Sequence, residues 1–432
     1  MTNTTRKVDT MRYMVRVSIL AIALIAVAIS FSMAAAAQNA AKGVDHPSAA
    51  SEDECIAVLK GDAAWQAKYE ACTRLRQVGT AKSVPALAAL LGDEKLSHMA
   101  RYALEPMQDP ESADALRKAL GKTKGQQKLG VITSLGVKRD SKSTKAIAKS
   151  LKDKDADVAR AAAGALGRIG TPEANAALAV FAKAAPDALR DAVAEGRLAG
   201  AEMLVKDGKG NLAVPYYADL LTDQRQFVQF GALRGVVNAD PGGAVALLTK
   251  TMSGDDAVLR DFAAQVVAEL PGADMTKPLA ATVASLPPAA QAAMLRGLGD
   301  RKDPAAREAV VAALASNDKN VKTAAVIALG SLGSEADVPA LAALLGTGDA
   351  DLAAAARTAL GNENNKSFDD AIAAAVANTS GAARAGLVEL LSDRMAPKAA
   401  QTALASLKDG DAAVRLAALH ALTKLGGPAE AP

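Results

Sequence analysis

Aromatic residues are scarce in this chain of 432 residues, making up 3% of it. Runs in which β-branched and polar residues alternate are almost absent, so no β-sheet is expected. Half of the residues are nevertheless apolar, and Ala and Leu account for most of them. Such Ala-rich sequences favour helices that pack closely together. The composition therefore predicts an all-α protein.

Histidine is equally rare, and the sequence motifs of the common enzyme classes are missing. The three histidines are His46, His98 and His420, which lie in different parts of the chain. None of the patterns H-E-x-x-H, C-x-x-C, C-x-x-C-H, the P-loop, G-x-G-x-x-G or G-x-S-x-G occurs. We therefore expect no catalytic residues, no metal site and no cofactor, and a non-enzymatic role.

Only two cysteines are present, Cys55 and Cys72, and they lie 17 residues apart. They fall in two predicted helices that would pack antiparallel across Gly61. In an oxidising compartment one disulfide would staple these helices together. Measured from the turn, however, Cys72 lies further along its helix than Cys55 does along its own. At a rise of about 1.5 Å per residue this offset moves the two Cα atoms apart, whereas a disulfide requires them within about 7 Å. A disulfide and two buried thiols both stay open.

Residues 1–37 have the character of an export signal. Basic side chains come first, at Arg6, Lys7, Arg12 and Arg16. An uncharged run over 17–37 follows and ends in small alanines before Gln38, which favours cleavage and a periplasmic or secreted protein. The alternative is an uncleaved anchor, because the run is long enough to span a bilayer. No Cys follows the run, so a lipoprotein is not expected.

The basic pI of 8.6 originates in this segment. Its removal takes away four basic residues and Asp9, so 46 basic and 46 acidic residues remain of the original 50 and 47. The neutral mature chain gives no reason to expect nucleic acid as a partner. Residues 38–51 are small, polar and aperiodic, and they read as a flexible tether.

From residue 52 to 426 the chain repeats one unit of two short amphipathic helices. Steps of mostly 31 residues connect twelve apolar anchors: Leu75, Leu104, Leu135, Leu166, Leu198, Val236, Val267, Leu298, Leu329, Leu360, Leu391 and Leu422. The position four residues before each anchor is also apolar, as at Ala325, and would share its helix face. This periodicity predicts a right-handed α–α superhelix, a solenoid of about twelve helix pairs. A tail over 427–432 follows.

Three residue types recur at fixed places in the repeat. Gly follows the anchor and would end the first helix, helix A, with a left-handed cap at Gly136, Gly167, Gly299, Gly330 and Gly361. Pro would open the second helix, helix B, at Pro85, Pro172, Pro215, Pro304, Pro339 and Pro397. Asp eleven residues before the anchor would cap helix A at Asp93, Asp155, Asp256, Asp318, Asp349 and Asp411.

The repeats DADVARAAAGALGRIG (155–170), DKNVKTAAVIALGSLG (318–333) and DAAVRLAALHALTKLG (411–426) resemble HEAT repeats of the phycobilisome-lyase type. The opening of the solenoid is similar to exported bacterial HEAT-repeat proteins. The resemblance implies a protein-interaction scaffold that binds a partner on its solenoid surface. Because related repeats occur in bilin lyases, a lyase-like or tetrapyrrole-binding chaperone is the alternative.

Positive charge concentrates in residues 117–154, which carry twelve basic residues against Asp140 and Asp153. Four of these form one stripe on a predicted B helix, opposite Ile147 and Leu151: Lys142, Lys145, Lys149 and Lys152. The stripe is either an ordinary solvated helix face or a site for an acidic protein, an anionic polysaccharide or an anionic membrane surface. Lysines present mobile point charges, which suit a diffuse polyanion. No aromatic residue lies between 103 and 180, so stacking on single-stranded nucleic acid is not expected.

The one long step, 38 residues from Leu198 to Val236, contains the polar segment 207–211. It also contains four aromatic residues, Tyr216, Tyr217, Phe227 and Phe230. These side chains either fill a gap where the repeat phase changes or form a partner-binding hot spot beside a protruding loop.

Overall fold

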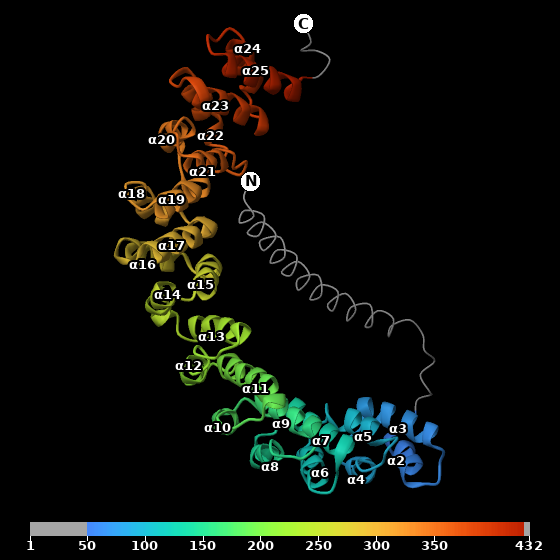
Figure 1. Ribbon diagram of the computed structural model, residues 1–432. Coiled ribbons are helices and arrows are strands. Elements are labelled where there is room, and N and C mark those ends of the chain that lie inside the picture. Colours follow the sequence, from blue (N-terminus) through green and yellow to red (C-terminus); the bar gives the residue numbers. More distant parts are fainter. Residues whose placement is uncertain (1–49, 427–432) are drawn as a thin grey trace. The chain divides into compact units, whose positions relative to one another are not determined.

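The computed structural model describes residues 50–426 (Figure 1). The expected signal segment 1–37, nearly all of the tether 38–51 and the tail 427–432 lie outside these residues. The described part forms 24 α-helices, named α2 to α25, with short 3₁₀ turns and no strand. The all-α prediction is therefore confirmed. Among these helices, none has both the length and the apolar character needed to cross a membrane.

The chain divides into two compact units, one ending at Lys138 and the other beginning at Arg139. In the first unit the A helices are α3 (Trp65–Val78), α5 (Ser97–Leu104) and α7 (Gly125–Val137). The B helices are α2 (Glu52–Lys60), α4 (Val84–Ala89) and α6 (Pro110–Leu120). Successive A helices of this unit contact each other, and each also contacts a neighbouring B helix, so the unit has two helical layers.

The second unit is also built of paired helices in two layers, as Figure 1 shows. Its A helices are α9 (Ala156–Ile169), α11 (Asp187–Lys206), α13 (Gln226–Ala239), α15 (Ala257–Glu269), α17 (Pro288–Arg301), α19 (Lys319–Leu332), α21 (Ala350–Leu360), α23 (Gly381–Asp393) and α25 (Ala412–Leu425). Its B helices are α8 (Thr144–Ser150), α10 (Pro172–Ala182), α12 (Gly210–Ala218), α14 (Ala244–Ser253), α16 (Thr276–Thr282), α18 (Arg307–Ala313), α20 (Val338–Leu345), α22 (Phe368–Ala377) and α24 (Ala399–Ser406). Most 3₁₀ turns come just before a B helix: η1 (Ser141–Ser143), η2 (Pro241–Gly243), η3 (Ala273–Met275), η5 (Pro304–Ala306) and η6 (Glu335–Asp337), while η4 (Val283–Ser285) follows α16.

Every predicted anchor lies in an A helix, which makes twelve helix pairs in the described residues. Ten of the anchors are buried, while Leu198 and Leu422 are half-buried. In α19 both Leu329 and the preceding Ala325 are completely buried. Burying one such Leu contributes about 1.5–3 kcal/mol. The repeated small-then-Leu seam is therefore the main source of cohesion between successive A helices.

None of the glycines after the anchors forms a left-handed cap of its A helix, so this prediction is wrong. Four of them lie inside helices that continue past them, and Gly361 ends α21 with φ −76 rather than a left-handed φ. A Cβ on Gly167 would lie 2.6 Å from the carbonyl oxygen of Gly196, and one on Gly330 would lie 2.8 Å from the Cα of Ala359. These glycines permit close approach of neighbouring A helices. In α9 the left-handed cap comes later, at Gly170, with φ 63.

The recurrent Asp residues cap helices as expected. Five of them accept backbone N–H bonds as N-caps of α9, α15, α19, α21 and α25: Asp155, Asp256, Asp318, Asp349 and Asp411. Asp93 instead accepts from the N–H groups of Lys95 and Leu96, in the turn ahead of α5. Each cap contributes about 1 kcal/mol. The recurrence of Asp at this position thus has a structural cause.

The prolines match the prediction only in part. Four stand in the first turn of a helix: Pro85, Pro172, Pro304 and Pro339. Pro215 lies inside α12 because that helix begins at Gly210, directly after a tight turn in which Gly208 has φ 73. Pro397 precedes α24, which begins at Ala399.

Candidate functional site

The lysine stripe lies on the B layer of the second unit. Lys142 is in η1, Lys145 and Lys149 are in α8, and Lys152 is in the turn that follows. All four side chains are exposed. On the opposite side of α8, Ile147 and Leu151 are 0% and 3% exposed.

The ammonium groups of the stripe have no direct partner in the protein. Among the described residues, neither an ion pair nor a side-chain hydrogen bond involves Lys142, Lys145, Lys149 or Lys152. Neighbouring lysines on one helix face repel each other, and like-charge pairs at this spacing destabilise a helix slightly. The stripe is therefore a row of four positive charges held on a rigid edge and turned to solvent.

The four aromatic residues of the long step do not form one group. Tyr217 is 4% exposed and packs beneath α13 against Gly235, where a Cβ would lie 2.3 Å from its ring. Tyr216 is half-buried, and its hydroxyl donates to the carbonyl of Pro172 at 3.2 Å. Both tyrosines belong to α12 and pack in one apolar cluster, Tyr217 inside it and Tyr216 against it.

Phe227 and Phe230 belong to α13 and lie on the A layer. Phe227 is 49% exposed, with the Arg225 guanidinium 5.9 Å from its ring centroid. Phe230 stacks on Phe262 of α15, with ring centroids 4.1 Å apart and an interplanar angle of 12°. The sequence did not single out Phe262, because it lies one repeat further along the chain.

In the polar segment 207–211, residues 207–209 form a tight turn between α11 and α12, and residues 210–211 begin α12, so the segment does not protrude as a loop. Asp207 ends α11 and accepts two hydrogen bonds from Arg139, at 2.9 and 2.6 Å. This forked pair lowers the pKa of Asp207 and raises that of Arg139. The extra length of the step lies mainly in α11, which has 20 residues.

Cys55 and Cys72 lie in the packed helices α2 and α3 as free thiols. They are 3% and 0% exposed. Burial raises the pKa of both thiols, and it raises that of Cys72 to about 12. In this state both side chains act as small apolar groups, and a disulfide remains a prediction.

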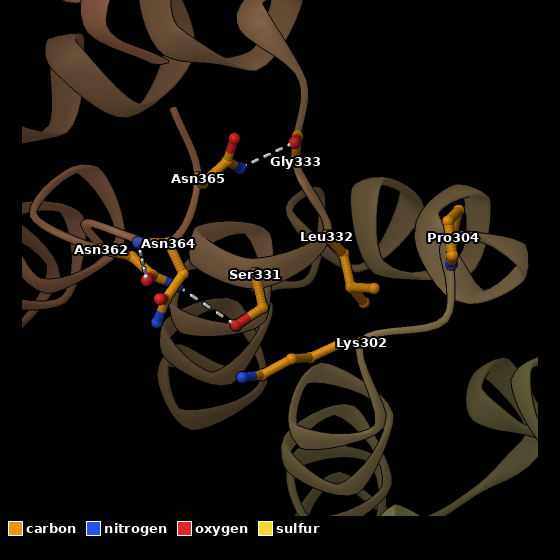
Figure 2. A pocket seen from close by; sticks show the side chains of 8 residues that line it. All are labelled: Lys302, Pro304, Ser331, Leu332, Gly333, Asn362, Asn364 and Asn365. Atoms are coloured by element: carbon orange, nitrogen blue, oxygen red, sulfur yellow. Dashed lines mark hydrogen bonds between the residues drawn. The ribbon is translucent and has the colours of Figure 1, made fainter. Parts of the chain in front are cut away.

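A hollow of about 280 Å³ opens at the end of the A layer in the second unit (Figure 2). It is lined by residues that follow three successive A helices: Lys302 and Pro304 after α17, Ser331, Leu332 and Gly333 at the end of α19, and Asn362, Asn364 and Asn365 after α21. In Figure 2 the ammonium group of Lys302 and the hydroxyl of Ser331 point to the same side of the hollow. Lys302 is exposed and has a left-handed backbone, with φ 58.

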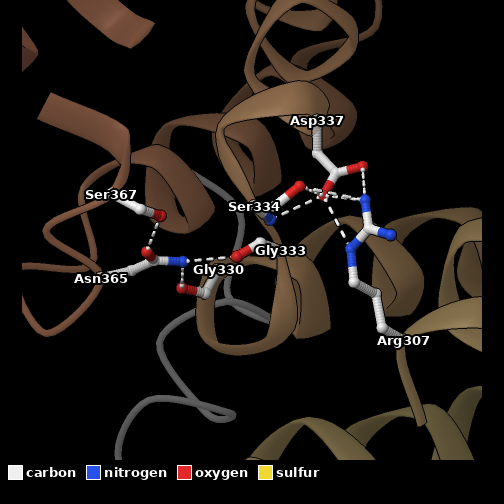
Figure 3. A network of polar contacts seen from close by, with 7 residues as sticks. All are labelled: Arg307, Gly330, Gly333, Ser334, Asp337, Asn365 and Ser367. Carbon is white, nitrogen blue, oxygen red and sulfur yellow. Dashed lines mark hydrogen bonds and ion pairs between the residues drawn. The ribbon is translucent and has the colours of Figure 1, made fainter. Parts of the chain in front are cut away.

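A polar network that is mostly half-buried connects the segments around this hollow (Figure 3). Asp337 is 8% exposed and accepts from Arg307 with both carboxylate oxygens, each 2.8 Å from Nη2. It also accepts from the backbone N–H of Ser334 at 2.7 Å. On the other side, Asn365 donates to the carbonyl of Gly333 at 2.9 Å and accepts from the hydroxyl of Ser367. The hollow therefore has rigid walls.

The first unit has a second open groove, of about 620 Å³, between the B helices α4 and α6. Its floor is formed by small and apolar residues such as Val84, Pro85 and Ala119. Lys118 and Lys122 stand at its rim, with Glu111 and Asp114 also in its lining. Charges of both signs therefore border this groove.

Neither the hollow nor the groove was predicted. The sequence signal for the hollow is GNENNKS (361–367), where three asparagines occur in four residues. Asparagine side chains satisfy backbone groups in turns, so this signal alone would have indicated a turn. In residues 50–426, no group of three His, Cys, Asp or Glu side chains lies close enough together to hold a metal ion.

The repeated part of the chain is similar to known proteins. The family model for HEAT repeats matches residues 124–199 and 275–361. No curated protein sequence matches the chain. Human deoxyhypusine hydroxylase in complex with glycerol is 20% identical, with 58% of this chain and 96% of that chain covered and a TM-score of 0.27.

Two further solved structures are similar at low identity. The complex of CpcE and CpcF of phycocyanin lyase from Nostoc is 18% identical, with 67% of this chain and 97% of that chain covered and a TM-score of 0.27. Kap121p bound to Ste12p is 11% identical, with coverages of 86% and 48% and a TM-score of 0.49. This chain thus spans about half the length of Kap121p, and none of these likenesses indicates a shared activity. The repeat match and the two-layered stacking of helix pairs together identify a HEAT-repeat solenoid.

Proposed function

We propose that this protein is a non-enzymatic scaffold that binds an acidic protein partner through the lysine stripe of η1 and α8. The observation that carries the proposal is the row of exposed ammonium groups of Lys142, Lys145, Lys149 and Lys152, which have no direct partner among the described residues. An acidic surface would relieve their mutual repulsion. Such complementarity increases association rate and specificity more than affinity, and salt weakens it.

Stacked repeats support this role because they present a surface that is ordered before binding. Ile147 and Leu151 fix α8 against its neighbours, so the lysine backbones need no ordering when a partner arrives. Preorganisation lowers the entropic cost of association. The mobile lysine side chains adapt to a surface on which the exact positions of the carboxylates vary.

The experiment is a pull-down of cross-linked partners from the envelope fraction with a charge-reversed variant. Lys142, Lys145 and Lys149 are changed together to Glu. A matched control changes the exposed lysines Lys277, Lys366 and Lys408 to Glu, which alters the net charge equally but spreads it over three repeats.

We expect the stripe variant to lose salt-sensitive capture of an acidic protein while the control and the wild-type protein retain it. Helicity by circular dichroism should be the same in all three proteins. Equal capture by the stripe variant and the control would contradict the proposal. If the wild-type protein instead binds a sulfated polysaccharide or anionic vesicles and the stripe variant does not, the partner belongs to that class and is not a protein.

Two further expectations from the sequence, export of the protein and the tetrapyrrole-binding alternative, have tests of their own. We propose that residues 1–37 are removed on export, which intact-mass measurement of the envelope protein tests by the presence of Gln38 at the N-terminus. For the tetrapyrrole alternative, the test is absorbance between 350 and 650 nm after incubation with haem or a bilin. A new band that persists through gel filtration would favour that alternative over a scaffold.

A further inference from the structure

Basic side chains close several joints between successive A helices. Three residues after the anchor, Arg301 donates to the carbonyls of Val267 at 3.1 Å, Leu270 at 2.5 Å and Gly272. These carbonyls lie at and beyond the C-terminal end of α15, where helices leave acceptors unsatisfied. Lys138 and Arg394 stand at the same place after their anchors and do the same for α5 and α21.

The joints around the hollow are closed without such a side chain, as are most joints of the chain. At the corresponding position α19 has Leu332, whose side chain has no donor. After α21 the carbonyls of Gly330 and Gly333 receive hydrogen bonds from Asn362 and Asn365, whose side chains are shorter than arginine. These short side chains line the hollow in Figure 2.

Some polar side chains of the hollow form hydrogen bonds within the protein, and others, called uncommitted below, have none or a free donor. Asn362 donates to Gly330 and Ser331, and Asn365 donates to Gly333, so both are part of the frame. Among the described residues, the side chains of Lys302 and Asn364 have no hydrogen-bond or ion-pair partner. The hydroxyl of Ser331 accepts one bond, from Asn362, and its proton remains to be donated.

The uncommitted groups favour one class of ligand. They offer an ammonium, a hydroxyl proton and an amide, and Lys302 is the one charged residue among the described residues that line the hollow. A single positive charge with neutral donors suits a monoanion with two acceptor oxygens. Pro304 and Leu332 add apolar wall. The left-handed backbone of Lys302 is unusual for a residue other than Gly and marks a specified position.

We propose that this hollow binds a carboxylate on a short apolar stem, through Lys302, Ser331 and Asn364. The ligand is a small organic acid or the terminal or side-chain carboxylate of a peptide. This site lies in a different repeat from the lysine stripe and does not rest on the proposed scaffold function.

The test uses the full chain labelled with ¹⁵N and titrated with propanoate in a buffer free of carboxylates. Propanamide serves as the neutral ligand of the same shape. We expect propanoate to shift the backbone resonances of Lys302 and Ser331 and the side-chain amide of Asn364, with a Kd of about 1 mM or weaker, as suits so small a ligand. Propanamide should leave them unchanged.

Two variants separate the site from general surface charge. Lys302→Asn removes the charge and tolerates a left-handed backbone, and we expect about tenfold weaker binding because a charge-assisted hydrogen bond is lost. Lys366→Asn removes an exposed lysine of the same segment that does not line the hollow, and binding should stay as in wild type. Asn364→Ala should weaken binding severalfold.

The source of the carboxylate is distinguished by a further pair of titrations. A short alanine peptide with a free C-terminal carboxylate is compared with the same peptide carrying a C-terminal amide. Tighter binding of the acid than of propanoate assigns the site to a peptide, and weaker binding assigns it to a small organic acid. Equal shifts by propanoate and propanamide, or a change of less than twofold in Lys302→Asn, would overturn the proposal.

Discussion

Arg394 provides the sharpest test of how the repeats hold together. Its side chain is completely buried. It donates from Nε to Asp369 at 2.7 Å, from Nη1 to the carbonyls of Leu360 at 2.7 Å and Asn362 at 2.6 Å, and from Nη2 to the carbonyl of Asn365 at 2.7 Å. One guanidinium thus joins α23 to the end of α21 and to the start of α22.

The substitution Arg394→Met keeps much of the aliphatic volume and removes the charge. It leaves Asp369, whose side chain is 13% exposed, without its cation, and three carbonyls without a donor. Removing one partner of a buried ion pair costs about 3–5 kcal/mol. The four lost hydrogen bonds are included in that figure because they share one side chain and their energies are not additive.

Hydrogen exchange of backbone amides is the suitable assay, because a solenoid opens locally and a single global unfolding energy is not defined for it. We expect amide protection in α21 and α23 to fall by about 100- to 4,000-fold, which is the energy above at 1.4 kcal/mol per tenfold. Protection in α9, several repeats away, should change little.

Arg296→Met is the matched control. Arg296 donates to Asp261 at 2.6 Å, but the two side chains are 42% and 65% exposed. An exposed pair contributes about 0–1 kcal/mol, so protection around α17 should fall by less than about fivefold. If the two variants lose protection to the same extent, burial of the guanidinium is not what closes the joint.

Two further predictions concern packing and pH. Gly167→Ala would place a Cβ 2.6 Å from the carbonyl oxygen of Gly196, so exchange protection in α9 should fall by the equivalent of about 1–2 kcal/mol. Gly164→Ala in the same helix meets no atom within 4 Å and should raise protection by up to about 1 kcal/mol; the same sign for both would refute the close approach. Burial raises the pKa of Cys72 to about 12, above an unfolded value of about 8.5. The stabilising contribution of the protonated thiol is complete below the unfolded pKa and declines towards pH 12. In Cys72→Ala this decline should be smaller, and in the native protein labelling by iodoacetamide at pH 8 should be much slower than in urea. A disulfide with Cys55 would instead leave no thiol to label in urea without reductant.

The sequence predicted the fold well because burial depends directly on apolar side chains. A Leu or Val every 31 residues must face the interior in every copy, and all twelve anchors lie in A helices. The Asp caps were predictable for a similar reason, since Asp318 satisfies N–H groups two and three residues away in its own helix. Neither inference requires knowing which residue of the next repeat lies opposite.

The failed predictions involve contacts between repeats. A Gly near a helix end has the same local signature whether it caps the helix or lies against a neighbour. Gly330 is of the second kind because Ala359, from the next A helix, lies against it. Likewise Tyr217 and Phe227 are ten residues apart, but α12 belongs to the B layer and α13 to the A layer. Their closeness in sequence therefore indicated one aromatic group where the structure has two.

The hollow also illustrates why the candidate site was not predictable. The position three residues after the anchor is basic in three copies only, at Lys138, Arg301 and Arg394, and most other copies have an apolar residue there, such as Leu332. The importance of this position depends on the carbonyls that the basic side chains reach across the joint. Around the hollow, asparagine side chains reach the carbonyls instead. Because each joint is closed by its own set of donors, the joints differ from one another where the anchors do not. The anchors therefore hold the fold together, and the joints are the places to look for specific binding.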